Sequence, residues 1–111
     1  MYPDLDEARL LHAGLRAIID RHVGSESDYR ALRRVLELCR RAGSAVDDRY
    51  CRDKLRLVED FAAEMFSHGE QRAQFLKSQI VAALELFSSR LYSLELGRRA
   101  ARRATIGRIA A

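Results

Sequence analysis

Residue types that could hold a metal ion occur together toward the end of a predicted helix. Asp60, Glu64 and His68 follow one another at intervals of four residues, which places all three on one face of an α-helix. Their carboxylate and imidazole groups could bind a divalent cation if another helix supplied a fourth ligand. A solvated acidic strip that ends in a histidine explains the same residues without a metal, and we expect this second arrangement.

Nucleophilic catalysis would need a cysteine beside a base. The cysteines are Cys39 and Cys51, and two histidines, His12 and His22, border the apolar face of the first predicted helix. Neither histidine is next to a nucleophile in the sequence, although folding could bring one beside a cysteine. An oxyanion site and a substrate pocket are also required, and a small chain without a glycine-rich loop offers little material for either. We therefore expect no enzymatic activity, no cofactor and no small-molecule substrate.

Positive charge is concentrated at the end of the chain. The five arginines of this tail are Arg98, Arg99, Arg102, Arg103 and Arg108. Without them, the 15 remaining basic residues nearly balance the 16 acidic residues, so the sequence predicts a nearly neutral body with a basic tail. In a helix, four of these arginines would share one arc with alanines opposite. Such a face suits nucleic-acid phosphates or an anionic membrane surface, and it equally suits a solvated helix end.

The helical pattern changes character at Gly97. A helical wheel continued past this residue places Arg98 and Arg102 on the apolar stripe of the preceding helix. Either the helix ends at Gly97 or it projects beyond the body of the protein. We therefore divide the chain into a helical domain, residues 1–97, and a tail, residues 98–111, that is disordered or a helical extension.

Long windows without proline or tryptophan and with few glycines predict an all-α fold. The first helix is expected over about residues 4–23, the second from Tyr29 with Arg41 in its last turn, the third to about Ser67 and the fourth over about 70–96. Short connections between helices of this length favour an up-and-down bundle of four antiparallel helices. Asp4 with Glu7 marks the start of the first helix, and Gly24 with Ser25 or Ser27 marks the break before the second. The break before the third is marked by Gly43, with Ser44 as N-cap and Asp47 and Asp48 in the following turn, and the break before the fourth by Gly69.

Apolar residues at intervals of three and four define a core face for each helix. The faces are, for the first helix, Leu5, Ala8, Leu11, Leu15, Ile18 and Ile19, and for the second, Tyr29, Leu32, Leu36 and Cys39. For the third helix they are Cys51, Leu55, Val58, Phe61, Ala62 and Met65, and for the fourth, Leu76, Ile80, Leu84, Phe87, Leu91 and Leu94. We expect them to meet in one core.

The fourth helix carries more apolar residues than its core face needs. Its segment SQIVAALELFSS has a single charge, Glu85. A second apolar patch lies outside the core sector and consists of Phe75, Ala82, Leu86 and Leu96. Either the bundle covers this patch from two sides, or it pairs with another copy or with a protein partner, most simply in a two-fold homodimer.

These patterns lead to one functional expectation and one alternative. The two cysteines fit free thiols in a reducing compartment, and there is neither a secretory signal nor a run of roughly 18–20 apolar residues for a membrane span. We expect a small cytoplasmic interaction module, an adaptor, regulator or assembly subunit, that self-associates through its fourth helix. The alternative is a nucleic-acid-associated protein that uses the arginine tail as an electrostatic arm.

Overall fold

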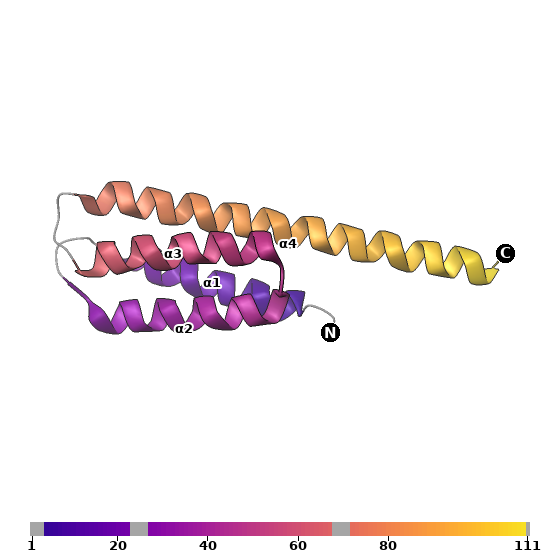
Figure 1. Ribbon diagram of the computed structural model, residues 1–111, viewed down its shortest axis with the longest axis horizontal. Coiled ribbons are helices and arrows are strands. Elements are labelled where there is room, and N and C mark those ends of the chain that lie inside the picture. Colours follow the sequence, from indigo (N-terminus) through magenta and orange to yellow (C-terminus); the bar gives the residue numbers. More distant parts are fainter. Residues whose placement is uncertain (1–3, 23–26, 68–71, 111) are drawn as a thin grey trace.

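The protein is a bundle of antiparallel helices in a computed structural model that describes residues 4–22, 27–67 and 72–110, with side chains as far as Ala104. Within these ranges it has four helices and no strand: α1 Leu5–Arg21, α2 Tyr29–Val46, α3 Arg49–Ser67 and α4 Ala73–Ala110. Each helix packs against the next along the chain, and α4 packs against α1, so α2 and α4 are diagonal neighbours (Figure 1). The predicted all-α, up-and-down bundle is confirmed.

The apolar faces of the four helices meet in one core. Its most enclosed side chains include Leu15 of α1, Val58 of α3 and Leu84 of α4, and the described residues contain no buried polar or charged side chain. The predicted faces of α1, α3 and α4 are confirmed, with Ile18, Phe61 and Leu94 at the edge of the core. Phe66, which the sequence analysis did not assign to the core, is also fully buried.

The predicted core face of α2 is wrong in part. Tyr29 is 63% exposed and Leu36 is 37% exposed. The residues of α2 that are buried are Val35, Leu38, Cys39, Ala42 and Val46. The reason is that α2 is longer than predicted. Two further core residues follow Arg41, and a buried face that includes them is rotated around the helix axis by about one residue from the predicted face.

Aspartates begin the first two helices. Asp4 accepts a hydrogen bond from the Glu7 backbone N–H at 3.0 Å, which confirms the predicted start of α1. Asp28, rather than the predicted Ser27, caps α2, and its side chain accepts from the backbone N–H of Ala31 at 3.0 Å. Gly24 and Ser25 lie outside the described residues.

The predicted boundary at Gly43 and Ser44 is also wrong, because α2 runs through both residues to Val46. Asp47 then takes the left-handed conformation with φ 49° and ψ 50°. Asp48 accepts a hydrogen bond from the Cys51 backbone N–H at 3.1 Å and so caps α3. Aspartate tolerates the left-handed conformation and also caps helices, so two adjacent aspartates replace the expected glycine stop and serine cap.

Gly43→Ala is expected to raise the free energy of unfolding by about 0.5–1 kcal/mol, because alanine favours the interior of a helix over glycine. A Cβ atom at this position would lie 3.8 Å from Leu55 Cδ1 and 3.9 Å from Arg52 Cγ, which are ordinary van der Waals distances. Urea denaturation followed by circular dichroism measures the change. A loss of stability would instead support a helix end at Gly43.

The last helix extends well past the other three (Figure 1). It passes through Gly97 to Ala110, so its predicted end near residue 96 is wrong and residues 98–110 form a helical extension. We call residues 97–110 the arm. The arm gives the molecule its elongated shape, with extents of 63 × 21 × 21 Å.

Candidate functional site

Ion pairs fix how α4 is rotated against the bundle. Arg16 of α1 binds Glu85 at 2.6 Å. Arg90 of α4 makes two hydrogen bonds, of 3.0 and 3.2 Å, to the carboxylate of Asp48 at the start of α3. These contacts lie on the flanks of α4 and hold its core face inward. The opposite face must therefore point away from the bundle.

This outward surface, which we call the outer face of α4, contains the predicted apolar patch. Phe75 is 53% exposed, Leu86 44% and Leu96 46%, and Ala82 is exposed as well. The interpretation in which helices of the same chain cover these side chains is therefore wrong. Three large apolar side chains remain open to solvent on a helix whose other side is already in the core.

The outer face is a continuous seam rather than the separate patch that the sequence analysis described. Its residues follow one another at alternating intervals of four and three: Phe75, Gln79, Ala82, Leu86, Ser89, Ser93, Leu96 and Ala100. None of them is charged, and the seam continues onto the arm. Alternating spacing of this kind is the pattern by which two helices pack in a coiled coil. The signal was present in the sequence, but the two serines hid it.

One serine of the seam, Ser93, has a hydrogen-bond partner within its own helix. The hydroxyl of Ser93 donates to the backbone carbonyl of Ser89 at 3.2 Å, within the same helix. A hydroxyl satisfied in this way can be covered by an apolar partner at little cost. The outer face is therefore suited to contact with another helix along its length.

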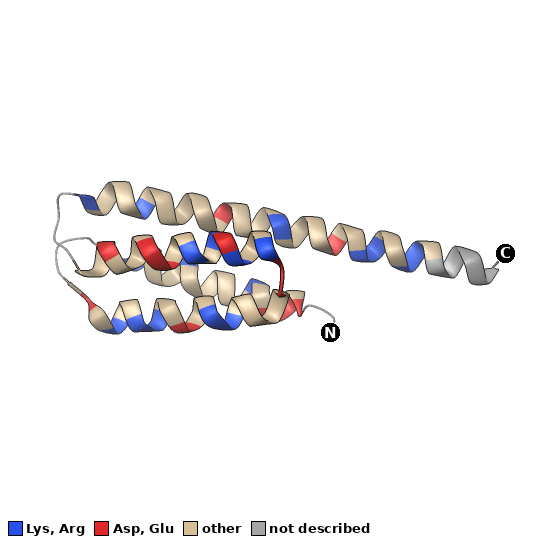
Figure 2. Cartoon of the chain, in the orientation of Figure 1, with Lys and Arg blue, Asp and Glu red and all other residues tan. Residues whose placement is uncertain are grey.

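The arginines of the tail lie on the arm, and Figure 2 shows the change from a body of mixed charge to this basic end. Arg99 is tied to the body, because its Nε lies 3.3 Å from Glu95, whose other oxygen is 3.9 Å from Arg9 of α1. Within the described residues, the predicted contact residues Arg98, Arg102 and Arg103 form no ion pair. The side chain of Arg108 is outside the described residues.

A second basic surface was missed. The outward side of α2 carries Arg30, Arg33, Arg34, Arg40 and Arg41, all exposed, against one acidic residue of that helix, Glu37. Arg34 pairs with Glu37 at 3.5 Å, and Arg41 pairs with Glu7 of α1 at 3.4 Å. The near-zero charge of residues 1–97 concealed this surface, because acidic residues elsewhere in the body balance the arginines of α2.

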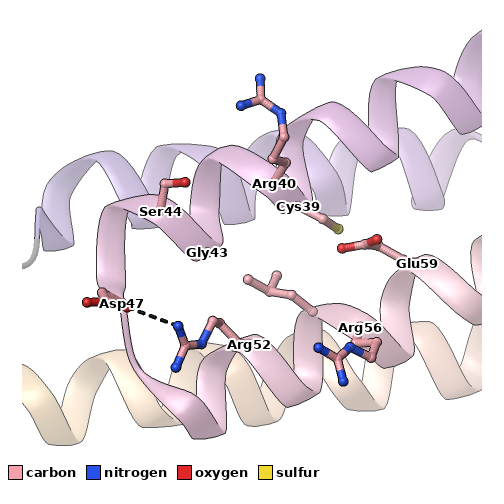
Figure 3. Close-up of a pocket in the computed structure, with 9 residues that line it drawn as sticks. Cys39, Arg40, Gly43, Ser44, Asp47, Arg52, Arg56 and Glu59 are labelled. Atoms are coloured by element: carbon pink, nitrogen blue, oxygen red, sulfur yellow. Dashed lines mark hydrogen bonds and ion pairs between the residues drawn. The ribbon is translucent and has the colours of Figure 1, made fainter.

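A cleft of about 320 Å³ lies between α2 and α3, beside Gly43 (Figure 3). Its lining residues are Cys39, Arg40, Gly43, Ser44, Asp47, Arg52, Leu55, Arg56 and Glu59. Arg52 pairs with Asp47 at 3.1 Å, so the cleft presents charges of both signs. Burial, together with the nearby carboxylate of Glu59, raises the pKa of the Cys39 thiol to about 12. This thiol stays protonated at neutral pH and is a poor nucleophile.

His12 of α1 and His22, which directly follows that helix, pack against aromatic rings. His12 stacks on Phe87 with ring centroids 6.1 Å apart, and His22 meets the edge of Phe66 at 4.5 Å. Burial lowers the pKa of both histidines. Their Nε2 atoms are buried and have no hydrogen-bond partner. Both imidazoles are therefore neutral at pH 7 and serve as packing groups.

The candidate metal site is only partly within the described residues, because His68 lies outside them. Glu64 pairs with Arg72 at 2.6 Å. The described part of the chain contains no group of three or more histidine, cysteine, aspartate or glutamate side chains placed to hold a metal ion. In these ranges no helix is both long enough and apolar enough to cross a bilayer.

Asp48→Asn is expected to lower the free energy of unfolding at pH 7 by about 1–2 kcal/mol, because the cap of α3 loses its charged pair with Arg90. The hydrogen bonds from Arg90 are the main reason that the pKa of Asp48 falls to about 2. Since this pKa is depressed, the stabilisation is complete above about pH 4 and is lost as the pH falls through 2. Urea denaturation of both proteins between pH 7 and 2 should show their difference shrinking below pH 4. A constant difference would contradict this assignment.

No family model, curated protein or solved structure matches this chain. The geometry of the molecule itself therefore has to carry the functional interpretation. Within the described chain, three surfaces carry side chains without a partner: the outer face of α4, the arginines of the arm apart from Arg99, and the basic side of α2.

Proposed function

We propose that this protein is a small, non-enzymatic interaction module, an adaptor, regulator or assembly subunit, that acts as a homodimer joined through the outer face of α4. The observation that carries the proposal is the uncharged seam from Phe75 to Ala100, which stays exposed after the bundle has formed. A helix that is apolar on two opposite sides needs cover on both of them. The bundle covers one side, and a partner helix would cover the other.

A second copy of the chain is the simplest partner. Two-fold symmetry uses the same surface on both subunits, so three exposed apolar side chains become six at one interface. Leu86 and Leu96 would supply the apolar centre of that interface, and Phe75 would extend it. We further propose a cytoplasmic location, because both Cys39 and Cys51 are free thiols, as is usual in a reducing compartment.

Leu86→Glu is expected to convert the protein from twice its 12.7 kDa chain mass to the monomer mass, with unchanged helicity. Two-fold symmetry would bury two carboxylates in the seam, which should weaken association by about 100-fold or more. Light scattering over a range of concentrations measures the mass, and circular dichroism measures helicity.

Leu36→Glu is the matched control. Leu36 has a similar exposure, 37% against 44% for Leu86, and lies on α2, diagonally opposite α4. This variant should keep the dimer mass. A wild-type protein that is monomeric at all accessible concentrations would refute the proposed homodimer. Loss of helicity in Leu86→Glu would mean that Leu86 supports the fold and is not a contact residue.

We propose, as a second candidate, a nucleic-acid-associated protein that uses the arm as an electrostatic contact. The specific observation is that Arg98, Arg102 and Arg103 project on a helix beyond the bundle without an ion pair among the described residues. A helix of this kind can be laid along a phosphate backbone. The described part of the arm has no aromatic residue to stack on bases, so binding would be independent of sequence and sensitive to salt.

A further inference from the structure

We infer that the two α4 helices of the dimer are antiparallel, with the two-fold axis beside Leu91, so that the arm of each subunit lies along the outer face of the other subunit's α4. This inference rests on the proposed homodimer and adds its orientation and register. It is carried by the spacing of the seam and by the charges beside it.

The spacing of the seam restricts the register. In an antiparallel pair with its axis beside Leu91, Leu86 lies opposite Leu96 of the partner subunit, and Ser89 lies opposite Ser93 of the partner subunit. Ala82 then meets Ala100 of the partner subunit. Among antiparallel registers, this one brings the exposed leucines of both subunits into contact. A shift by one heptad in either direction would place the leucines against serine, glutamine or Arg103 and bury less apolar surface.

The sizes of the seam side chains would also permit a parallel pair, in which every seam residue meets its own copy. Charge decides between the two orientations. A parallel pair would set the two arms side by side and bring eight arginines, four from each of the two sequences, into one short stretch. Arg103, one step beyond Ala100 at the same spacing, would even face its own copy. The antiparallel pair separates the arms to opposite ends of the dimer.

The antiparallel pair also creates an attractive contact. Glu85 and Arg99 flank the same edge of the seam, each next to one of its residues, Leu86 and Ala100. Their side chains are 60% and 63% exposed. In the proposed register, Glu85 of each subunit comes within reach of Arg99 of the partner subunit, once on each side of the axis. This contact adds to the ion pairs that Glu85 makes with Arg16, and Arg99 with Glu95, within each chain. Arg103, which follows Ala100 at the next interval of three, comes to lie opposite Gln79 of the partner subunit.

Disulfide trapping tests the register. Ala82→Cys mixed with Ala100→Cys should form a cross-linked heterodimer under mild oxidation, because the two positions are opposed. Ala82→Cys alone should not cross-link, since its own copy would be about 27 Å away at 1.5 Å per residue. The native cysteines do not interfere, because both are buried. Ser89→Cys mixed with Ser93→Cys provides a second opposed pair near the axis.

Charge exchange gives an independent measurement. Glu85→Arg alone and Arg99→Glu alone should each weaken dimerisation by roughly tenfold, and the double variant should restore it. Self-cross-linking of Ala82→Cys would overturn the antiparallel arrangement and leave the homodimer intact. A dimer in which none of the opposed pairs cross-links would overturn the register. A wild-type protein that stays monomeric would instead remove the proposed function on which the register rests.

Discussion

Phe87→Ala is expected to lower the free energy of unfolding by about 3–5 kcal/mol, which is a large part of the stability of a domain of this size. Phe87 is fully buried in the core and stacks against the ring of His12. Removing its ring takes away apolar contact and leaves a cavity that helices packed on several sides cannot close completely. Urea denaturation at a concentration where the protein is monomeric measures the effect without a contribution from association.

Phe75→Ala provides the matched control, because it removes the same ring from the same helix at a position that is 53% exposed. Its effect on the stability of the monomer should stay below about 1 kcal/mol. The same variant should weaken association, whereas Phe87→Ala acts mainly on folding. Equal losses of monomer stability for the two variants would contradict the division of α4 into a core face and an outer face.

Replacing Arg98, Arg102 and Arg103 together by glutamine abolishes most of the salt-dependent binding to oligonucleotides, if the arm is the nucleic-acid contact. Three phosphate contacts would make affinity fall by roughly 40-fold between 50 and 200 mM salt, and the variant should lose this dependence. Glutamine preserves helix propensity, so the arm should keep its helix. Titration of labelled duplex and single-stranded oligonucleotides at the two salt concentrations measures the effect.

The basic side of α2 supplies the comparison. A second variant replaces Arg30, Arg33 and Arg40, the same number of arginines, by glutamine. Binding that survives in this variant but not in the arm variant supports the arm as the contact. The reverse result would assign binding to α2 and end the arm hypothesis. Absence of binding by the wild-type protein would remove the second candidate altogether.

Much of the fold could be predicted because helical periodicity is a local property. The buried faces of α1, α3 and α4 follow from apolar residues three and four apart, and the exposure of Leu86 and Leu96 follows from their place on the same helical wheel. The face of α2 could not be read reliably, because two neighbouring apolar rows compete along that helix. Which row was buried depended on whether the helix continued beyond Gly43.

The candidate site was predicted as a set of residues but not as a surface. The apolar outliers of the fourth helix and the arginines of the tail were found from the sequence. A single unbroken helix that carries both surfaces was one of two alternatives that the sequence left open, because glycine ends some helices and is accommodated in others. The basic side of α2 was missed for a different reason. A net charge does not show where the positively and negatively charged residues lie on the folded protein.

The sequence by itself determined that this chain forms helices, how many there are, and which residues of three of them are too apolar to face water. Those properties depend on local periodicity and on capping groups a few residues away. Only the tertiary structure decided that α2 packs through Ala42 and Val46, that Asp48 joins α3 to Arg90, and that the outer face of α4 stays open. The physical reason is that packing between helices far apart in the chain selects among local alternatives of nearly equal free energy.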